Sequence, residues 1–569
     1  MKLLILGGYG VFGGRLAELL SDCGQLTLMI AGRTERKAVA FCEGYKGAAT
    51  VIPLGLDRVN IAKALATHKP DIVIDASGPF QDYGDDPYLV PRACIAAKVD
   101  YMDFADAADF VFGISELDDD AKAAGVTVLS GVSSFPVLTA AVLRKLGEDM
   151  TITDVKGGIA PSPYAGIGLN VMKAVVGYAG GPVKLIRDGK PYEAKGLAES
   201  LRYTIAPPGY LPLRNLHFSL VDVPDLQVLP ATYPEIGNIW MGAGPVPEIL
   251  HKTLNLLAKA RATFRLPSWE PFAPLFFKIL NLMKFGEHRG GMFVQAQGIK
   301  KGGLRDGKLI TKSWHLLAEG EDGPYIPSMA IEGLVRKWLR GARPDIGARP
   351  ATEALELEDY DALIKEREIY TGFRDDTHRG VFKTILGDQY ESLPPKIQAL
   401  HGDGQTTWRG NANVQSGRNP LAKLIARIVG LNVKAGENIP LTVTFKTDEN
   451  GEQWTRDFAG QTFKSHFSVG TGRNTHLAVE RFGIIKIGLA LVIERGKDGD
   501  KLRFIPRRCT VLGIPLPKFL LPREESFEAE RDGKFHFNVA VKIPIAGLIA
   551  AYEGWLEPEK ETAELENVA

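Results

Sequence analysis

The sequence has few cysteines, no long apolar run and no excess of charge of either sign. Its four cysteines are scattered through 569 residues and form no C-x-x-C pair, which argues against a disulfide scaffold and a cysteine-based zinc site. No segment reaches the roughly eighteen uninterrupted apolar residues that a membrane-spanning helix needs. The 68 basic residues balance the 68 acidic ones, so there is no electrostatic reason to expect nucleic acid as a partner.

Motifs for metal binding and for secretion are missing as well. The ten histidines include no H-E-x-x-H motif and no short-range pair, so no metal site is expected. The apolar run from Leu3 to Leu6 is too short for a signal peptide and continues into glycines instead of a cleavage site. The reducing cytoplasm is therefore the expected location.

What the sequence does contain, at its start, is a cluster of glycines between an apolar run and a helix-forming segment. Gly8, Gly10 and Gly13 fill the G-x-G-x-x-G frame, in which the first permits a tight turn, the second lets the backbone approach a pyrophosphate and the third lets the helix pack close to the strand. The helix N-terminus then faces the phosphates. The pattern predicts a dinucleotide-binding strand-turn-helix.

The end of the second apolar run indicates which dinucleotide binds. Leu26 to Ala31 is followed by Gly32-Arg33-Thr34, where an NAD site usually places an acid for the ribose 2′-hydroxyl. An arginine instead suits a 2′-phosphate, so NADP is favoured over NAD. The alternative is that Arg33 is one more solvated charge beside Arg36 and Lys37.

From Met1 to about residue 150, short apolar runs alternate with helical patterns. This alternation predicts an α/β domain with a doubly wound parallel sheet, whose ligand lies outside the carboxyl ends of the strands. The predicted strands are Leu3 to Leu6, Leu26 to Ala31, Thr50 to Pro53, Ile72 to Asp75, Asp100 to Asp103 and Val126 to Leu129. The predicted helices are Phe12 to Leu20, Glu35 to Cys42, Ile61 to His68, Tyr88 to Ala97, Ser115 to Ala124 and Pro136 to Leu146.

Three of these strands end in small or polar residues that suit a ligand. Ala76-Ser77-Gly78 would let a nicotinamide or its ribose lie against the backbone, Asp103 and Asp106 bring carboxylates, and the turn with Ser133 is again small and polar. Each alone is more typical of a plain loop, since glycine and serine mark turns. Three such ends on one rim favour a binding site.

These segments resemble the saccharopine dehydrogenase-like (saccharopine reductase-like) proteins. The resemblance rests on Gly7 to Gly14, Ala76 to Phe80 with Tyr83-Gly84, Ala93-Cys94 before Asp100 to Asp103, and Gly131 to Pro136. It covers Met1 to about Leu146 and, more loosely, extends to about residue 370. It implies an NAD(P)-binding Rossmann domain, a following mixed domain, and hydride transfer between nicotinamide and an imine. Phe104 to Ala107 departs from relatives that often carry a glycine and a glutamate there, so an amine substrate does not follow.

The pattern changes after about residue 150 to strands and long loops. We predict an α+β domain over residues 151–374, with an antiparallel sheet, a hairpin around Arg187-Asp188-Gly189, and a helix that Ser328 caps and Gly341 ends. By residue type, His288 is a candidate proton donor and Arg289 a candidate partner for a substrate carboxylate. Asp222, Asp225 and Tyr233 are further polar candidates. For each, an ordinary surface-loop role is the competing interpretation.

One stretch of this region, Pro274 to Phe285, is unusually apolar with a narrow polar stripe. Packing on the protein body is the ordinary explanation for such a helix, and a membrane-surface contact or a homodimer interface are the alternatives.

Strand patterns dominate a third region, residues 381–558, and about seven or eight strands predict a strongly curved or barrel-like antiparallel sheet. This region resembles the domain of unknown function 4166 through Trp454 to Phe458, Glu480 to Gly483, Leu512 to Pro517 and Tyr552 to Leu556. The resemblance implies no activity. A cavity for an apolar ligand and a solid core are both compatible with such a sheet. The acidic tail, residues 559–569, is expected to be disordered.

The leading hypothesis is an NADP-dependent oxidoreductase that acts on an imine, a secondary amine or a carbonyl. The alternative is a non-catalytic NADP-binding or sensing protein whose third domain binds an apolar ligand or a protein partner. The residues predicted to bind the cofactor are Gly7, Gly8, Tyr9, Gly10, Val11, Phe12, Gly13, Arg33, Thr34, Ala76, Ser77, Gly78 and Ser133. The residues predicted to take part in catalysis are Asp103, His288 and Arg289.

Overall fold

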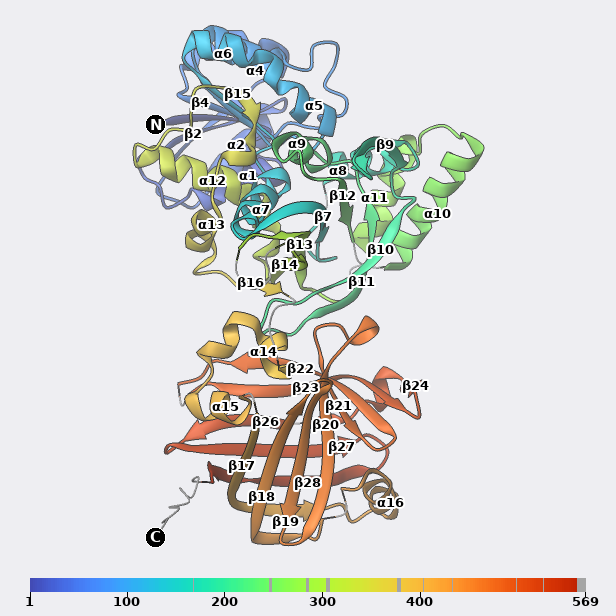
Figure 1. Ribbon diagram of the computed structural model, residues 1–569. Coiled ribbons are helices and arrows are strands. Elements are labelled where there is room, and N and C mark those ends of the chain that lie inside the picture. Colours follow the sequence, from blue (N-terminus) through green and yellow to red (C-terminus); the bar gives the residue numbers. More distant parts are fainter. Residues whose placement is uncertain are drawn as a thin grey trace. The chain divides into compact units, whose positions relative to one another are not determined.

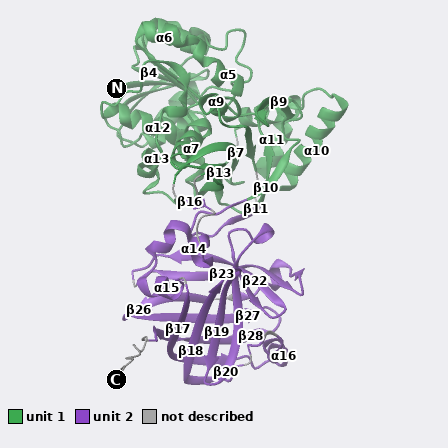
Figure 2. Ribbon diagram, viewed as in Figure 1, with its two compact units in different colours: residues 1–203, 216–370 green, residues 204–215, 371–569 purple. Residues whose placement is uncertain are grey.

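The computed structural model describes residues 1–166, 168–244, 248–282, 286–302, 307–375, 380–402, 404–431, 433–497, 499–524 and 526–559. The chain forms two compact units, one of residues 1–203 with 216–370 and one of residues 204–215 with 371–569 (Figure 2). The first two predicted domains fall mainly in the first unit, and the third falls in the second. The predicted disordered tail lies outside the described residues apart from Glu559.

The first unit begins with a parallel sheet in the order β15-β6-β5-β4-β1-β2-β3 (Figure 1). The predicted doubly wound α/β fold is confirmed, and all six predicted strands form. Its strands are β1 (Lys2–Leu6), β2 (Thr27–Gly32), β3 (Thr50–Gly55), β4 (Ile72–Asp75), β5 (Asp100–Asp103), β6 (Thr127–Ser130) and β15 (Gly347–Pro350). Its helices are α1 (Val11–Leu19), α2 (Glu35–Gly44), α3 (Ile61–His68), α4 (Leu89–Ala97), α5 (Ala108–Gly113), α6 (Asp118–Ala124) and α7 (Thr139–Gly147).

Two elements of this domain have no counterpart in the prediction, α5 and β15. Strand β15 comes from far downstream and pairs in parallel with β6, so that Gly347 faces Thr127. Its sequence, Gly-Ala-Arg-Pro, has no apolar run, and only the tertiary pairing makes it a strand.

A second sheet of the first unit has the order β10-β11-β12-β7-β13-β14-β16. It is mixed and not purely antiparallel as predicted, because β7 and β12 run parallel. Its strands are β7 (Met150–Ala160), β10 (Ser200–Ile205), β11 (Leu213–Leu220), β12 (Asn238–Ala243), β13 (Gly290–Lys300), β14 (Leu309–Ala318) and β16 (Ile369–Asp375). The predicted hairpin forms separately as β8 (Pro182–Arg187) and β9 (Lys190–Lys195), with Asp188 and Gly189 at φ +51° and +70°.

The remaining α-helices described in this unit are α8 (Leu169–Tyr178), α9 (Asp225–Thr232), α10 (Glu248–Phe264), α11 (Ala273–Leu282), α12 (Ile326–Leu339) and α13 (Leu357–Ile364). Gly341 follows α12 at φ +86° and ends it as predicted. The prediction that Ser328 caps α12 is wrong, because the helix begins at Ile326 with Pro327 in its first turn. Ser328 is buried within it, and its hydroxyl donates to the Phe12 carbonyl at 3.2 Å.

The apolar stretch predicted over Pro274 to Phe285 corresponds to α11, and its residues 283–285 lie outside the described residues. Phe276, Phe277 and Leu280 pack with Met172 and Val176 of α8, as the ordinary interpretation required. No helix in the part of the chain that the structure describes is long and apolar enough to cross a membrane.

The second unit is a closed antiparallel barrel, which confirms the predicted curved or barrel-like sheet. Ten strands of the described residues run from β22 through β17 and β28 to β23, and pairing of β22 with β23 closes the ring. Its strands are β17 (Gln405–Ser416), β18 (Gly436–Asp448), β19 (Gly451–Phe458), β20 (Gln461–Val469), β21 (Ala478–Phe482), β22 (Ile485–Glu494), β23 (Lys501–Val511), β26 (Ser526–Arg531), β27 (Lys534–Ile543) and β28 (Gly547–Pro558). The short strands β24 (Ile514–Pro515) and β25 (Arg523–Glu524) pair at its margin.

Three helices accompany the barrel, α14 (Val381–Leu386), α15 (Pro395–Leu400) and α16 (Pro420–Val429). Aromatic side chains fill much of the interior, and Phe382 of α14 stacks within 6.0 Å of the Trp454 ring among them. The helices α14 and α15 therefore share the core of the barrel.

Candidate functional site

The glycine loop has the close packing that its sequence predicts. Gly7 lies at φ +71°, and a Cβ there would be 2.6 Å from the Ala76 carbonyl oxygen. A Cβ at Gly13 would be 2.5 Å from the Gly7 carbonyl oxygen, and one at Gly10 would be 2.9 Å from the same atom. Gly10 precedes α1 without a side-chain cap. The first N–H groups of α1 thus have no side-chain cap, which is the arrangement that suits an anion at a helix N-terminus.

Tyr9 joins the glycine loop to the end of β2. Its ring covers Gly32, where a Cβ would lie 2.5 Å from it, and the Thr34 N–H donates to its hydroxyl at 3.1 Å. Arg33, between them, is exposed and forms no ion pair with a described residue. The Arg33 guanidinium is therefore exposed at the end of β2.

At the end of β4 a buried carboxylate holds the turn that carries Ala76 to Gly78. Asp75 Oδ1 accepts from the Ser77 N–H at 2.9 Å and from the Ser77 hydroxyl at 2.6 Å. Tyr83 donates its hydroxyl to the other oxygen, Oδ2, and Arg58 lies 3.8 Å over the Tyr83 ring. Burial raises the pKa of Asp75, and these donors offset part of that rise.

Asp103 plays a similar part at the end of β5. Its Oδ1 accepts from the N–H groups of Ala105 and Gly131 at 2.9 and 2.7 Å, and from the Ser130 hydroxyl at 3.0 Å. Its Oδ2 accepts no hydrogen bond from a described residue, and burial raises the pKa of Asp103 to about 7. The carboxyl therefore fixes the turn that leads to Ser133.

The strand ends meet at one rim, as the fold requires. The Phe12 ring of α1 stacks on Phe104 at 5.7 Å, and the Val132 N–H donates to the Asp103 carbonyl at 2.8 Å. The predicted cofactor-binding residues from Gly7 to Gly13, Ala76 to Gly78 and Ser133 thus belong to one edge of the sheet.

The segment between β7 and α8 connects this rim to the second sheet. Arg15 donates to the Ala165 carbonyl at 3.0 Å, and the Asn170 amide donates to the Gly78 carbonyl at 2.7 Å. The Tyr164 ring lies 6.2 Å from that of His288, which precedes β13. The segment therefore contacts α1 and the residues before β13, and the start of α8 contacts the β4 turn.

An acidic group lies where α8, α9 and the β8–β9 hairpin approach the rim. Burial, and then the carboxylates of Asp109 and Asp106, raise the pKa of Asp222 to about 6. Burial, Asp222 and Asp106 raise the pKa of the Tyr178 hydroxyl. Asp109 is paired with Lys184 at 2.9 Å. The group places a carboxyl that titrates near neutral pH beside the rim.

The other predicted polar residues are placed less favourably for chemistry. His288 is exposed, and Arg289 is buried with its guanidinium held by Glu287 at 2.8 Å and Glu319 at 3.6 Å. Asp225 is buried at the start of α9. Burial raises its pKa to about 7, and the nearby Thr139 hydroxyl offsets part of that rise. Tyr233 lies by Arg144 instead of the rim. The described residues contain no group of three or more His, Cys, Asp or Glu able to hold a metal.

The barrel interior has its own polar group and a small cavity. Arg456 donates to Ser465 at 2.9 Å and lies 3.5 Å from Glu480, while His401 lies 2.6 Å from Glu528. A cavity of about 40 Å³ lies between Arg456, Glu528 and apolar side chains. Pockets for drug-sized ligands measure about 300–1,000 Å³, so this cavity is too small for a lipid-sized ligand.

Several site residues were not found by sequence reasoning. Tyr83, Asp75 and Asn170 act through partners that only the folded chain brings near, although the Asp-x-Ser spacing of Asp75 and Ser77 is a local signal for a carboxylate that caps its own turn. Tyr178 carries no such signal.

Comparison with known proteins supports the first and last parts of this description. Residues 3–129 match the family model described as the saccharopine dehydrogenase NADP binding domain, and residues 393–556 match the domain of unknown function DUF4166. Both predicted resemblances are confirmed, and the N-terminal domain is a pyridine-nucleotide-binding domain of the oxidoreductase type. A search of curated proteins gave no match.

Solved structures with a likeness to the chain include the WlbA (WbpB) dehydrogenase from Thermus thermophilus, in complex with NAD and α-ketoglutarate. It is 12% identical, covering 63% of this chain and 94% of that chain, with a TM-score of 0.30. The dehydrogenase MviM from Clostridium difficile is 8% identical, covering 64% of this chain and 98% of that chain, with a TM-score of 0.29. Similarity at this level carries no argument about the site.

Proposed function

We propose that this protein is an NADP-dependent oxidoreductase that transfers a hydride between nicotinamide and an imine, a secondary amine or a carbonyl. The observation that carries the proposal is the uncapped start of α1 behind Gly8, Gly10 and Gly13, with the unpaired Arg33 beside it. The glycines leave space and N–H groups for a pyrophosphate, and the arginine supplies charge for a 2′-phosphate.

The residues of the rim have distinct tasks in this proposal. Gly8 to Gly13 hold the pyrophosphate, and Ala76 to Gly78 with Ser133 support the nicotinamide ribose. When bound, the nicotinamide supplies or accepts the hydride. Asp75 and Asp103 are positioning residues, because each is buried and accepts hydrogen bonds from the turns that face the ligand.

The proton that accompanies the hydride requires a group with a pKa near neutrality. Asp222 lies in the acidic group beside the rim and burial raises its pKa to about 6, whereas His288 is exposed in the segment before β13. We therefore assign the proton transfer to Asp222. Arg289, held by two carboxylates, supports the start of β13 and does not bind a substrate carboxylate.

The proposal is tested by titrating the purified protein with NADPH and NADH, read by the fluorescence of the bound nicotinamide, and then by offering imines and carbonyls to the NADPH complex. Preferred binding of NADPH and its oxidation by a member of either pool would support the proposal. Tight binding without oxidation by any of them would favour the nucleotide-sensing alternative. If neither nucleotide binds, the glycine loop is not a phosphate-binding site.

The role of Asp222 has its own test. The Asp222→Asn variant is expected to lower kcat about 100-fold or more while NADPH affinity stays unchanged. Asp188→Asn, which makes the same change on an exposed carboxylate at the β8–β9 turn, is the matched control and should retain most of the activity.

A further inference from the structure

One end of the barrel differs from the other in the loops that it presents. The strands are antiparallel, so successive connections alternate between the two ends. The end defined here as the α16 end carries residues 417–435, which include α16, and the turns 459–460, 483–484, 512–513 and 544–546.

Large apolar side chains are exposed at the α16 end. Those on its loops and turns include Leu512, Ile514 and Ile545, which are 72, 69 and 67% exposed. The exposed large apolar residues of these segments include Leu421, Leu424, Ile428, Ile484, Leu512, Ile514 and Ile545, and Phe519, between β24 and β25, is 73% exposed as well. Among the described residues of the opposite end, the exposed large apolar side chain is Val469, at 39%. A cluster of this kind on one face marks an interaction surface.

Helix α16 turns its larger side chains outward. Ala422 and Ala426 pack against Ala546 and Ile549 of the barrel, whereas Leu421, Leu424 and Ile428, spaced along one face, are about half exposed. A helix that only covers the barrel would turn its large residues inward and its polar residues outward. The outer apolar face of α16 therefore has no partner within the described chain.

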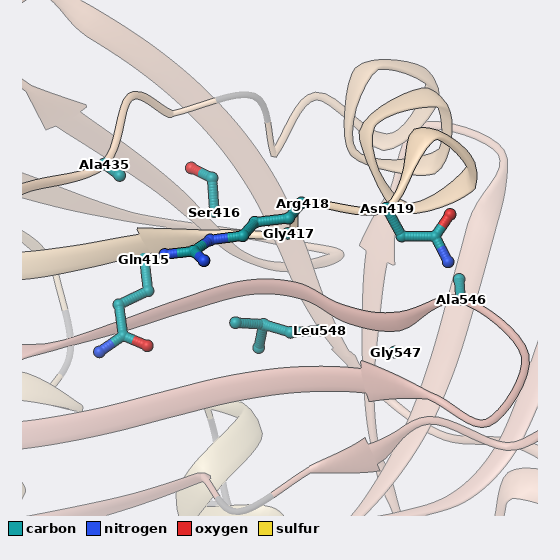
Figure 3. Close-up of a pocket in the computed structure, with 9 residues that line it drawn as sticks. All are labelled: Gln415, Ser416, Gly417, Arg418, Asn419, Ala435, Ala546, Gly547 and Leu548. Carbon is teal, nitrogen blue, oxygen red and sulfur yellow. The ribbon is translucent and has the colours of Figure 1, made fainter.

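Two chain segments that reach the α16 end carry basic but no acidic residues. Residues 404–436 and 533–552 contain no aspartate or glutamate, and the exposed Glu437 at the start of β18 is the first acidic residue after the first of these segments. Five exposed basic side chains of these segments form no ion pair with a described residue. They are Arg418, Lys423, Arg427, Lys434 and Lys542. In Figure 3, Arg418 extends toward Gln415 at an open recess of about 660 Å³ beside the start of α16.

We propose that the α16 end of the barrel docks on the surface of an anionic lipid bilayer. The helix lies with its apolar face in the interface, the apolar turn residues enter beside it, and the basic side chains meet the anionic headgroups. The basic side chains without an ion pair lie among exposed apolar side chains. This combination favours an anionic bilayer over a second copy of the chain, because two copies would bring like charges together.

The experiment is flotation of the full-length protein with two kinds of vesicle. One kind is phosphatidylcholine alone, and the other is phosphatidylcholine with about 30% phosphatidylglycerol, which makes its surface anionic. We expect binding to the anionic vesicles at least about tenfold tighter than to the neutral ones. Raising the salt from 0.1 to 0.5 M shortens the screening length and should weaken that binding several-fold.

Variants locate the contact. Leu424→Asp combined with Leu512→Asp, and separately Lys423→Glu combined with Arg427→Glu, should each reduce binding to anionic vesicles about tenfold or more. Val469→Asp, at the opposite end of the same barrel, and Leu275→Asp, on the exposed side of α11, are the matched controls and should bind like the wild type. Unchanged thermal melting of both units verifies that each variant is folded.

Several outcomes would overturn the proposal. Equal binding to both kinds of vesicle, or to neither, would remove the anionic bilayer as the occupant. Loss of binding in Leu275→Asp with no loss in the α16 variants would assign the membrane contact to α11 instead. A concentration-dependent dimer that Leu424→Asp abolishes, without vesicle binding, would make the α16 end an interface between copies of the chain.

Discussion

The parallel sheet of the first unit and the barrel of the second both bury charged side chains, but they use them in opposite ways. Asp75 and Asp103 lie at the carboxyl ends of β4 and β5 and accept hydrogen bonds from the turns that follow these strands. Arg456 and Glu480 lie inside a closed ring, where each is 6–7% exposed and faces the other at 3.5 Å.

The difference follows from the edges. A parallel sheet leaves its strand ends and helix N-termini unsatisfied at one rim, and a ligand can complete them. A closed barrel has no free edge, and its interior is filled by its own side chains. Chemistry is therefore expected at the rim of the first unit, whereas the barrel is left with its loops as contact surfaces.

Replacing Gly10 by valine should abolish dinucleotide binding at the rim, and this is the largest effect expected. A Cβ at residue 10 would lie 2.9 Å from the Gly7 carbonyl oxygen, and the valine methyl groups would occupy the path of the pyrophosphate. Binding of both NADPH and NADH, measured by nicotinamide fluorescence, should fall below detection.

Gly14→Ala is the matched control for Gly10→Val. A Cβ at residue 14 meets the edge of the Phe41 ring at 3.3 Å, which a small movement of that ring relieves. Both dinucleotides should bind this variant. Retained binding in a folded Gly10→Val protein would mean that the turn is not the phosphate site.

The barrel should respond to Arg456→Met through stability alone. Glu480 would remain buried without its partner, and breaking a buried pair costs about 3–5 kcal/mol. Burial already raises the pKa of Glu480 to about 7. Denaturant unfolding of the second unit should shift accordingly, whereas NADPH titration of the first unit should not change.

The double variant Arg456→Met with Glu480→Leu sharpens this test. With both charges gone, most of the lost stability should return, because apolar residues often replace a buried pair at little cost. If the double variant is as unstable as the single one, packing of Arg456 against Trp454, 4.8 Å away, and not its charge, accounts for the effect.

The two regions also differ in how far the sequence predicts them. Apolar runs and glycine turns are local signals, so the strands of the parallel sheet and the glycine loop were found with small shifts at their ends. In the barrel, β17 reads Gln-Thr-Thr-Trp-Arg-Gly-Asn and pairs with β18 and β28 along its length. Its polar, glycine-containing sequence gives no such signal, and neighbours distant in the chain decide its conformation.

The site shows the same division. The strand ends with Ala76 to Gly78 and Asp103 were predictable because a parallel sheet brings all its carboxyl ends to one edge. The approach of Asp222 and Tyr178 to Asp106 was not, since it depends on how the second sheet and α8 pack around that edge. The wrong prediction that Ser328 caps a helix has the same origin. Its hydroxyl donates to the carbonyl of Phe12, which is more than 300 residues away in the chain.

A smaller effect is expected from Arg33→Asp, which tests whether the rim selects the 2′-phosphate. Loss of a charge-assisted bond worth about 1.5–3 kcal/mol should weaken NADPH binding about 10- to 100-fold and leave NADH binding little changed. Arg36→Asp makes the same charge change on another exposed residue of this segment and should affect neither. Equal losses for NADPH and NADH in Arg33→Asp would contradict the assignment.

The last prediction concerns the proton on Asp103, whose pKa burial raises to about 7 from an unfolded value near 3.9. Between about pH 4 and 7 the unfolded chain has released this proton and the folded one keeps it, so stability falls as the pH rises through that range and is level above it. Asp103→Asn keeps an oxygen for the donors on Gly131 and Ala105 and removes this slope. Relative to the wild type it should gain about 1–4 kcal/mol between pH 5 and 8, measured by unfolding of the first unit. Asp118→Asn removes a carboxyl whose pKa the Lys122 ammonium lowers, so its slope lies below pH 4 and its profile from pH 5 to 8 should match the wild type. An unchanged slope in Asp103→Asn would mean that Asp103 is ionised in the folded protein and that its second oxygen has found a donor.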